Sequence, residues 1–81
     1  MLAKVYVTPK KAILDPQGKA IANSLHTLNY AEVRDVRMGK YLEVSLHGLS
    51  RTEAEQRVEE MCRRLLANLV IEDFRFEIFE E

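Results

Sequence analysis

The 81-residue sequence has little of what usually reinforces a small protein. Its single cysteine, Cys62, excludes an internal disulfide, and one unpaired thiol fits a reducing compartment such as the cytoplasm. The two histidines, His26 and His47, have no second ligand at metal-binding spacing, so a zinc site is not predicted. A chain of this length buries only about 60–65% of the surface that its unfolded form exposes. We therefore expect a partner subunit to supply the missing stability.

Three further absences exclude classes of function. No run approaches 18 apolar residues and no signal-peptide pattern opens the chain, so neither a membrane partner nor secretion is expected. The net charge of −1 gives no surplus of lysine and arginine for binding nucleic acid. The three glycines are scattered, which argues against a glycine-rich phosphate loop. These features predict a cytoplasmic protein that binds neither nucleic acid nor membrane.

The first half of the chain predicts a strand and a helix. Residues 2–8 alternate apolar and polar side chains, as a half-buried strand does, and Pro9 ends the alternation. Asp15 and Pro16 form a helix start, because aspartate caps free N–H groups and proline fits the first helical position. The helix is expected to reach about Leu28. Its expected buried stripe comprises Ile21, Ala22, Leu25 and Leu28.

The last third predicts a second helix and a final strand. Residues 50–53 form a capping box, in which Ser50 and Glu53 cap each other's backbone N–H groups. Glutamates four residues before arginines mark the solvent-facing side of the helix. Residues 71–79 alternate as a strand. The expected buried stripe of this helix comprises Ala54, Val58, Met61 and Leu65.

The middle segment allows two arrangements. Its apolar side chains occupy even positions from Val36 to Leu46, interrupted only at Lys40. A hairpin with a three-residue turn at residues 39–41 keeps them on one face. A single long strand, kinked at Gly39, also does so. Such a strand would span about 46 Å, against about 30 Å for a compact domain of this size, and would overhang onto a second copy. We favour the hairpin.

The predicted fold is therefore a single domain, residues 1–81, of the α+β class. It is a β-α-β-β-α-β, ferredoxin-like variant with two helices on one face of a mainly antiparallel sheet, a sheet that the long-strand arrangement would extend across a dimer. The other face would mix polar and aromatic side chains, as association surfaces do. Its expected members are Lys4, Tyr6, Thr8, Tyr41, Glu43, Ser45, Arg75, Glu77 and Phe79.

No group of residues predicts a catalytic centre. Cys62 lies in mid-helix beside the apolar stripe with no base nearby, which predicts a half-buried structural thiol. Residues 15–19 place free N–H groups at a helix start, but Asp15 would repel an anion, so we interpret them as a cap.

Three stretches carry a family resemblance. Residues 15–20 (DPQGKA) and 33–41 (VRDVRMGKY) resemble the two signatures of the PurS family. Residues 66–74 (LANLVIEDF) are similar to that family's usual stretch, with Leu69 where proline is common. The resemblance covers essentially the whole chain. PurS is the small subunit of phosphoribosylformylglycinamidine synthase, an ATP-dependent enzyme of purine biosynthesis.

The resemblance implies a non-catalytic subunit with two larger partners. In that family a PurQ-type glutaminase releases ammonia from glutamine, and a PurL-type synthetase uses ATP and magnesium to add the nitrogen to its substrate. PurS contacts both, as a homodimer or higher oligomer, and assists ammonia transfer. No cofactor is expected on this chain itself, because ATP and magnesium would belong to the synthetase.

The sequence patterns and the resemblance together predict roles for eight residues, none of them catalytic, cofactor-binding or metal-binding. As a hypothesis, the interface residues are Tyr6, Arg37, Lys40, Tyr41 and Arg75. The structural residues are Asp15 and Pro16, at a helix cap, and Gly39, at a turn or bulge.

Two other functions suit the same architecture. A stand-alone small-molecule-sensing regulatory domain is the main alternative, but it would need a glycine-bearing loop that residues 9–12 do not supply. A hydrolase of the acylphosphatase type would need an arginine in a glycine-rich anion loop with an asparagine beside it. The asparagines here, Asn23, Asn29 and Asn68, lie in the predicted helices or at their ends, with no such loop nearby.

Overall fold

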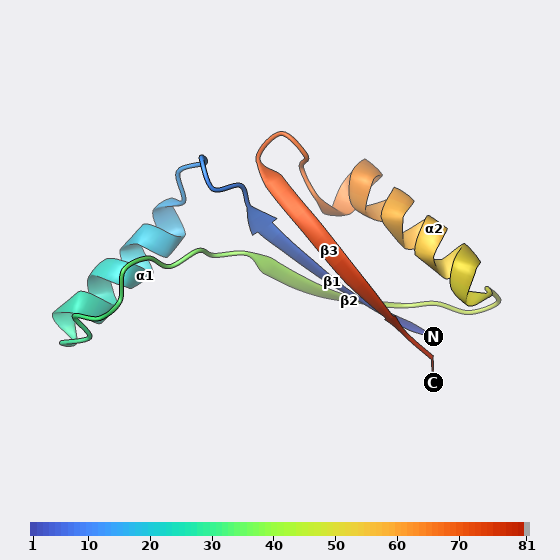
Figure 1. The fold of residues 1–81 in the computed structure, drawn as a ribbon, viewed down its shortest axis with the longest axis horizontal. Helices are drawn as coiled ribbons and strands as arrows, with labels where there is room; N and C mark the ends of the chain where they lie inside the picture. The colour runs from blue at the N-terminus through green and yellow to red at the C-terminus, as the bar shows by residue number, and fades with distance from the viewer. Residues whose placement is uncertain (81) are drawn as a thin grey trace.

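The computed structural model describes residues 1–80, which form a three-stranded antiparallel sheet and two helices (Figure 1). The central strand β1 lies between β2 and β3 and is antiparallel to both. The molecule is elongated, with extents of 50 × 28 × 14 Å. In chain order the elements are β1 (Leu2–Pro9), α1 (Pro16–Thr27), β2 (Lys40–Ser45), α2 (Arg51–Met61), the π-helical turn η1 (Cys62–Leu66) and β3 (Glu72–Phe79).

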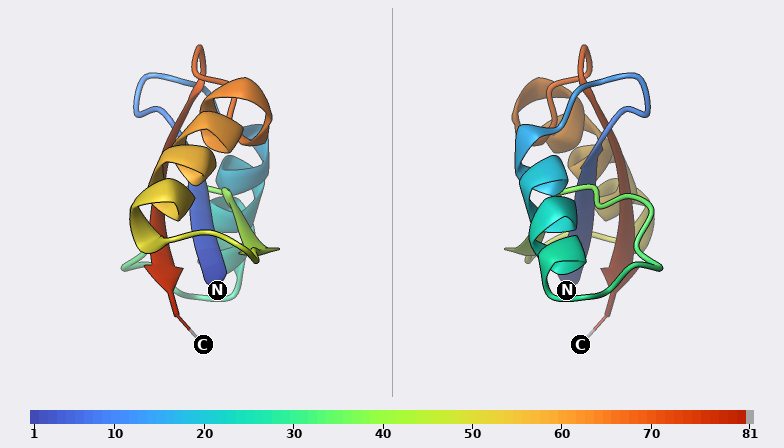
Figure 2. Two further views of the ribbon diagram at one scale, coloured as in Figure 1. Left: turned by 90° about the vertical axis from the view of Figure 1, so that its right-hand side faces the viewer. Right: turned by 90° about the vertical axis from the view of Figure 1, so that its left-hand side faces the viewer.

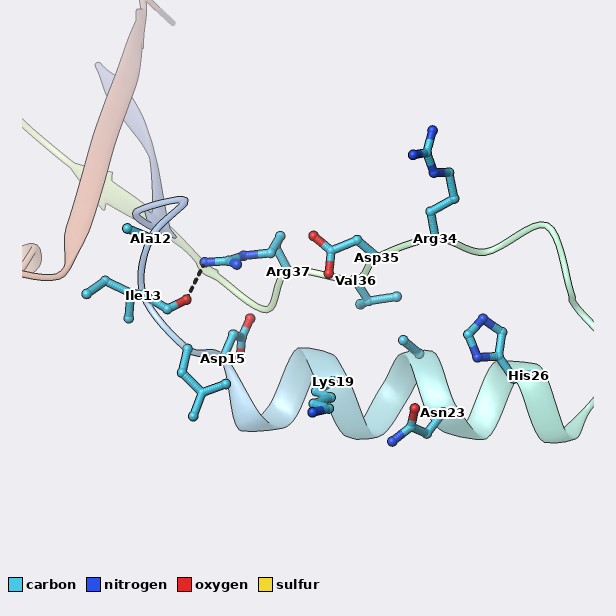
Figure 3. A pocket seen from close by; sticks show the side chains of 12 residues that line it. Ala12, Ile13, Asp15, Lys19, Asn23, His26, Arg34, Asp35, Val36 and Arg37 are labelled. Carbon is cyan, nitrogen blue, oxygen red and sulfur yellow. Dashed lines mark hydrogen bonds between the residues drawn. The ribbon is translucent and has the colours of Figure 1, made fainter.

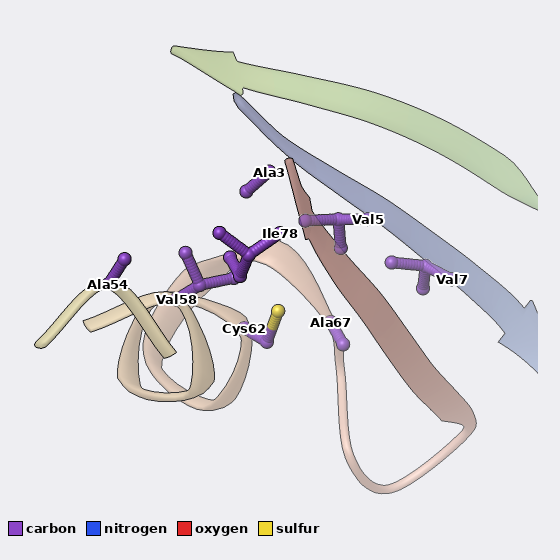
Figure 4. Close-up of a cluster of buried hydrophobic side chains, with 8 residues drawn as sticks. All are labelled: Ala3, Val5, Val7, Ala54, Val58, Cys62, Ala67 and Ile78. Carbon is purple, nitrogen blue, oxygen red and sulfur yellow. The ribbon is translucent and has the colours of Figure 1, made fainter. Parts of the chain in front are cut away.

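The sheet, α2 and η1 form one packed unit, which we call the body. Alternate residues of β1 face α2 and are fully buried, as the alternation predicted, and Phe74, Phe76 and Ile78 of β3 contribute to the same side. The buried core consists of Ala3, Val5, Val7, Ala54, Val58, Cys62, Ala67 and Ile78 (Figure 4). Burial of these side chains is the main force that holds the body together.

The second helix begins as predicted and ends differently. Ser50 and Glu53 form the predicted capping box. In η1 the amide of Ala67 donates to the carbonyl of Cys62, five residues back, at 2.9 Å. This wider turn changes which residues face the core. Leu65, predicted to be buried, is therefore 82% exposed, whereas Cys62, four residues after the buried Val58, is fully buried.

Residues 10–39, which include α1, project beyond the sheet, and we call them the arm. Figure 2, which views the long axis from each end, has α2 nearest the viewer at one end and α1 at the other. The prediction that α1 buries an apolar stripe was wrong for the single chain, because α1 does not cover the sheet. Ile21 is 38% and Leu28 is 65% exposed, and the buried residues of α1 are Gly18 and Ala22.

The favoured hairpin at residues 39–41 does not form. The chain instead runs in one extended line from the arm into β2, and residues 40 and 41 pair with Val7 and Tyr6 of β1. Residues expected in a turn are thus held in the sheet. The α+β class and the ferredoxin-like order still fit, with the extended run 34–45 in the place of the two middle strands.

Neither helix of the described residues 1–80 is long and apolar enough to cross a membrane.

Candidate association surfaces

The face of the sheet opposite α2, here called the open face, carries a row of aromatic and cationic side chains. Strand register places Tyr41 of β2 and Arg75 of β3 on either side of Tyr6 in β1. The two tyrosine rings are 5.2 Å apart between centroids, and the Arg75 guanidinium lies 4.0 Å from the Tyr6 centroid. Further along, the Lys4 ammonium lies 4.6 Å from the ring centroid of Phe79. These aromatic and cation–π contacts preorganise the face.

Both tyrosine hydroxyls of the row are tied to carboxylates. Tyr6 donates to Glu77 at 3.0 Å and Tyr41 donates to Glu43 at 2.7 Å. The hydrogen bond to Glu77 is the largest cause that raises the pKa of Tyr6. The hydrogen bond to Glu43, with a smaller contribution from desolvation, raises the pKa of Tyr41 to about 12. Both phenols therefore remain neutral hydrogen-bond donors at neutral pH.

Of the five predicted interface residues, three lie together and two lie elsewhere. Tyr6, Tyr41 and Arg75 form the row on the open face. Lys40 pairs with Val7 in the sheet register, so it belongs to the face that α2 covers, and it is exposed. Arg37 lies in the arm. The interface role of all five stays a prediction.

Asp15 and Arg37 connect the two segments where the arm joins the body (Figure 3). The Asp15 carboxylate caps α1 by accepting from the amide of Gly18 at 3.0 Å, and its other oxygen accepts from the amide of Met38 at 2.6 Å. The Arg37 guanidinium donates to the carbonyls of Lys10 and Ile13 at 2.7 and 3.1 Å. The bond from Met38 is the largest cause that holds the pKa of Asp15 below its usual value.

No local sequence pattern predicts this joint, because it links residues more than 20 positions apart. Pro16 occupies the first turn of α1 and Asp15 its cap position, where the pattern placed them. Gly39 is not in a turn. A Cβ there would lie 2.4 Å from the Val7 carbonyl oxygen, so glycine is required by close approach to β1.

The arm has a second close approach of backbone to backbone. A Cβ on Gly18 would lie 2.1 Å from the carbonyl oxygen of Val36. Glycine in α1 thus lets the extended segment lie against the helix.

Residues with reactive side chains are poorly placed for chemistry. The Cys62 thiol is buried, and desolvation raises its pKa, which disfavours the reactive thiolate. The His26 ring nitrogen lies 2.6 Å from the Val33 carbonyl oxygen on the exposed side of the arm. Within residues 1–80, no three His, Cys, Asp or Glu side chains are grouped so as to hold a metal ion.

A second uncovered surface lies beside β2 on the face that carries α2. Here Val44 adjoins Met61, Leu65 and Leu66 in a mainly apolar groove. This groove and the apolar stripe of α1 are both open in the single chain. The fold and these surfaces define a ferredoxin-like α+β domain whose exposed features suit association.

Comparison with known proteins agrees with this fold class and identifies the family. The family model described as PurS, phosphoribosylformylglycinamidine (FGAM) synthase, matches residues 2–80. The chain belongs to the PurS family, which confirms the resemblance found in the sequence.

Relatives match over nearly the full chain. The PurS subunit of phosphoribosylformylglycinamidine synthase from Bacillus subtilis (strain 168) is 51% identical over 77 residues, covering 95% of this chain and 90% of the relative. A solved structure of B. subtilis PurS has a TM-score of 0.87 at 49% identity and covers 98% of both chains. A chain of the PurLQS structure from Thermotoga maritima has a TM-score of 0.81 at 25% identity, with 95% of this chain and 96% of that chain covered. Nothing in these similarities supports the alternative of a stand-alone sensing domain.

Proposed function

We propose that this chain is the small, non-catalytic subunit of a cytoplasmic phosphoribosylformylglycinamidine synthase of purine biosynthesis. It holds a PurQ-type glutaminase and a PurL-type synthetase together, and the synthetase binds the ATP and magnesium. The observation that carries this proposal is the similarity, over nearly its whole length, to a chain of the Thermotoga maritima PurLQS structure.

The physical contribution of such a subunit is proximity. Ammonia released into water takes up a proton and loses the lone pair with which it attacks. An assembly that keeps the glutaminase and synthetase sites close and excludes water delivers ammonia before that happens. The subunit assists this transfer by holding its neighbours in place, for which shape and adhesion suffice.

Assembly as a homodimer would cover the two apolar surfaces that the single chain leaves open. The arm exposes Ile21 and Leu28, and the groove beside β2 exposes Leu65. One surface is the side of a helix and the other is a groove, and they lie on different parts of the molecule, so two copies can exchange arms about a two-fold axis. Burial of one such side chain contributes about 1.5–3 kcal/mol. The 50 Å length of the chain gives the arm the reach to cross to a neighbour.

The open face is the proposed contact for a large subunit. It lies opposite the groove, so it stays accessible in this homodimer. Tyr6, Tyr41 and Arg75 belong to the residue types that carry most binding energy at interfaces. Their contacts with each other fix their rotamers in advance, which lowers the entropy lost on binding.

Reconstitution tests the proposal. The chain is mixed with the glutaminase and synthetase subunits of the same cell, and the complex and its glutamine-dependent activity are measured. The double substitution Tyr41→Ala and Arg75→Ala should lower that activity about 10-fold or more, since each truncation at a hot spot costs about 2 kcal/mol. Activity with added ammonia, which needs no glutaminase, should change much less.

A matched control is Gln56→Ala with Arg57→Ala, two exposed residues of α2 that lie outside the groove. It should leave assembly and activity unchanged, because substitutions at exposed surface positions usually have little effect. Failure of the wild-type chain to join the two subunits would refute the proposed function. Normal assembly by the open-face variant would refute only the proposed contact. Lys40→Glu, on the other face, tests another of the predicted interface residues in the same assay.

A further inference from the structure

The direction of the arm is set mainly by polar contacts. Of the α1 residues, Gly18 and Ala22 are buried, and the core that holds the body consists of residues from the strands, α2 and the segment after it. Packing therefore contributes little to holding α1 at one angle to the sheet. Hydrogen bonds at the joint must supply the restraint.

Two side chains connect the segment that precedes α1, here called the entering side (residues 10–15), with the segment that returns to the sheet, here called the leaving side (residues 36–39). Asp15, on the entering side, accepts from the amide of Met38 on the leaving side. Arg37, on the leaving side, donates to the carbonyls of Lys10 and Ile13 on the entering side. The contacts thus cross the joint in both directions, and both carry a charged group, which makes them stronger than neutral hydrogen bonds.

The joint is also anchored to the body. The amide of Lys10 donates to the carbonyl of Ile71, the residue before β3, at 2.9 Å. On the leaving side, Gly39 lies against the backbone of β1 at Val7. Restraint at Asp15 and Arg37 is therefore transmitted from the body to α1, and not only within the arm.

We propose that Asp15 and Arg37 form an assembly latch that fixes the direction in which α1 projects and thereby sets the affinity of the homodimer. This inference rests on the homodimer of the proposed function. A latched arm already points toward its seat on the second copy. An unlatched arm samples many directions, and that freedom is lost on docking, which weakens association.

One substitution separates the latch from the helix cap. Asp15 uses one oxygen for the cap and the other for Met38. Asparagine caps a helix as well as aspartate does, but it has one oxygen, and its amide group would face the Met38 amide donor to donor. Asp15→Asn thus keeps the cap and removes the latch. Arg37→Met keeps the aliphatic stem of Arg37 and removes its donors.

Matched controls lie in the same segment. Asp35→Asn and Arg34→Met make the same changes of charge, at residues for which the described structure shows no hydrogen bond or ion pair. Sedimentation of the full-length chain gives the dimer dissociation constant of each variant. Amide hydrogen exchange, measured in the same variants, reports the opening of Met38 and of the body strands separately.

Asp15→Asn and Arg37→Met should each raise the dissociation constant about 10-fold or more, as expected for loss of a charge-assisted hydrogen bond. Exchange should accelerate at Met38 and stay unchanged in β1 and β3. Asp35→Asn and Arg34→Met should stay within about threefold of the wild type. Should Asp15→Asn fail to fold, Asp15→Ser, which also caps but has one oxygen, replaces it.

Three outcomes overturn the latch. One is an unchanged dissociation constant in both latch variants, and another is an equal rise in the controls. The third is faster exchange throughout the body, since the residues would then support the fold in general. A wild-type chain that is monomeric at every concentration refutes the homodimer itself, and the bridging of glutaminase and synthetase is still judged by reconstitution.

Discussion

The body and the arm contain apolar side chains at helical spacing, yet they bury them to different extents. In the body, Val58 lies under the sheet and is fully buried. In the arm, Leu28, which was predicted to belong to the buried stripe of α1 and follows the last residue of that helix, is 65% exposed. The body thus completes a hydrophobic core within one chain, whereas the arm leaves an apolar stripe exposed. In the proposed homodimer, the second copy, and not the helix's own sheet, covers the apolar stripe of α1.

The two regions also differ in what holds them in shape. The body depends on burial, and the arm on hydrogen bonds near the surface, each of which contributes about 0.5–1.5 kcal/mol net, or more where charged. The same kind of substitution should therefore unfold one region and only detach the other from its partner.

The largest effect is expected for Val58→Asp in the body. It places a charge at a fully buried site, which costs several kcal/mol, in a protein whose total stability is about 5–15 kcal/mol. Circular dichroism should show loss of cooperative unfolding. Leu65→Asp, on the same helical run but 82% exposed, should stay folded. A folded Val58→Asp chain would contradict the placement of the core.

In the arm, Ile21→Asp should leave the chain folded and weaken the homodimer about 100-fold or more. The side chain is expected to lose about 1.5–3 kcal/mol of apolar burial, and the new charge must be desolvated as well. Sedimentation measures dimerisation and circular dichroism measures folding. Asn23→Asp, on the opposite side of the same helix, is the control and should retain the dimer. If Ile21→Asp unfolds the chain, the arm is not independent of the body as argued.

The sequence predicted most of the body but, in the arm, little beyond the start and length of α1, for a physical reason. Strand alternation and the Ser50 capping box are local patterns, so they located the core face and the start of α2. Alternation also placed Tyr6, Tyr41 and Arg75 on one face, and strand order then made them neighbours. These features need no knowledge of distant contacts.

The path of residues 33–46 depends instead on contacts far apart in sequence. The even-numbered apolar pattern fits a hairpin and a single extended run equally well. The choice is made by pairing of Lys40 with Val7 and by the close approach of Gly39 to β1. The partners of Asp15 and Arg37, likewise, cannot be inferred from spacing, because the joint brings together segments on either side of a helix.

A smaller effect is expected for Cys62→Ser in the body core. The buried serine hydroxyl would have no evident partner among the apolar side chains around it, and an unsatisfied buried polar group costs about 1–3 kcal/mol. Chemical denaturation measures the change. Cys62→Ala removes the sulfur without adding a hydroxyl and is the control. If serine and alanine destabilised the protein equally, the serine hydroxyl would have to be hydrated or hydrogen-bonded. That result would contradict a dry, apolar core around Cys62.

The smallest effects concern pH and have opposite signs in the two regions. On the open face of the body, the pKa of Tyr41 is raised to about 12, chiefly by its hydrogen bond to Glu43. The unfolded chain therefore loses this proton first, near the ordinary tyrosine value of about 10. Stability from Tyr41 is complete below that value and is lost as the pH rises toward about 12.

In the arm, the lowered pKa of Asp15 has the reverse consequence. Its contribution is present above the ordinary aspartate pKa and is lost as the pH falls through the lowered folded value, because protonation removes an acceptor from Met38 and Gly18. Low pH should thus weaken the contacts that hold the arm, and high pH should weaken the contacts on the open face. Phenolate absorbance follows Tyr41, and Glu43→Gln should lower its pKa toward the ordinary value. The exchange protection factor at Met38 follows Asp15, and Asp15→Asn should make that protection factor independent of this titration. If acid lowered the protection factors in β1 as early as at Met38, the arm and the body would open as one unit, and the division between them would fail.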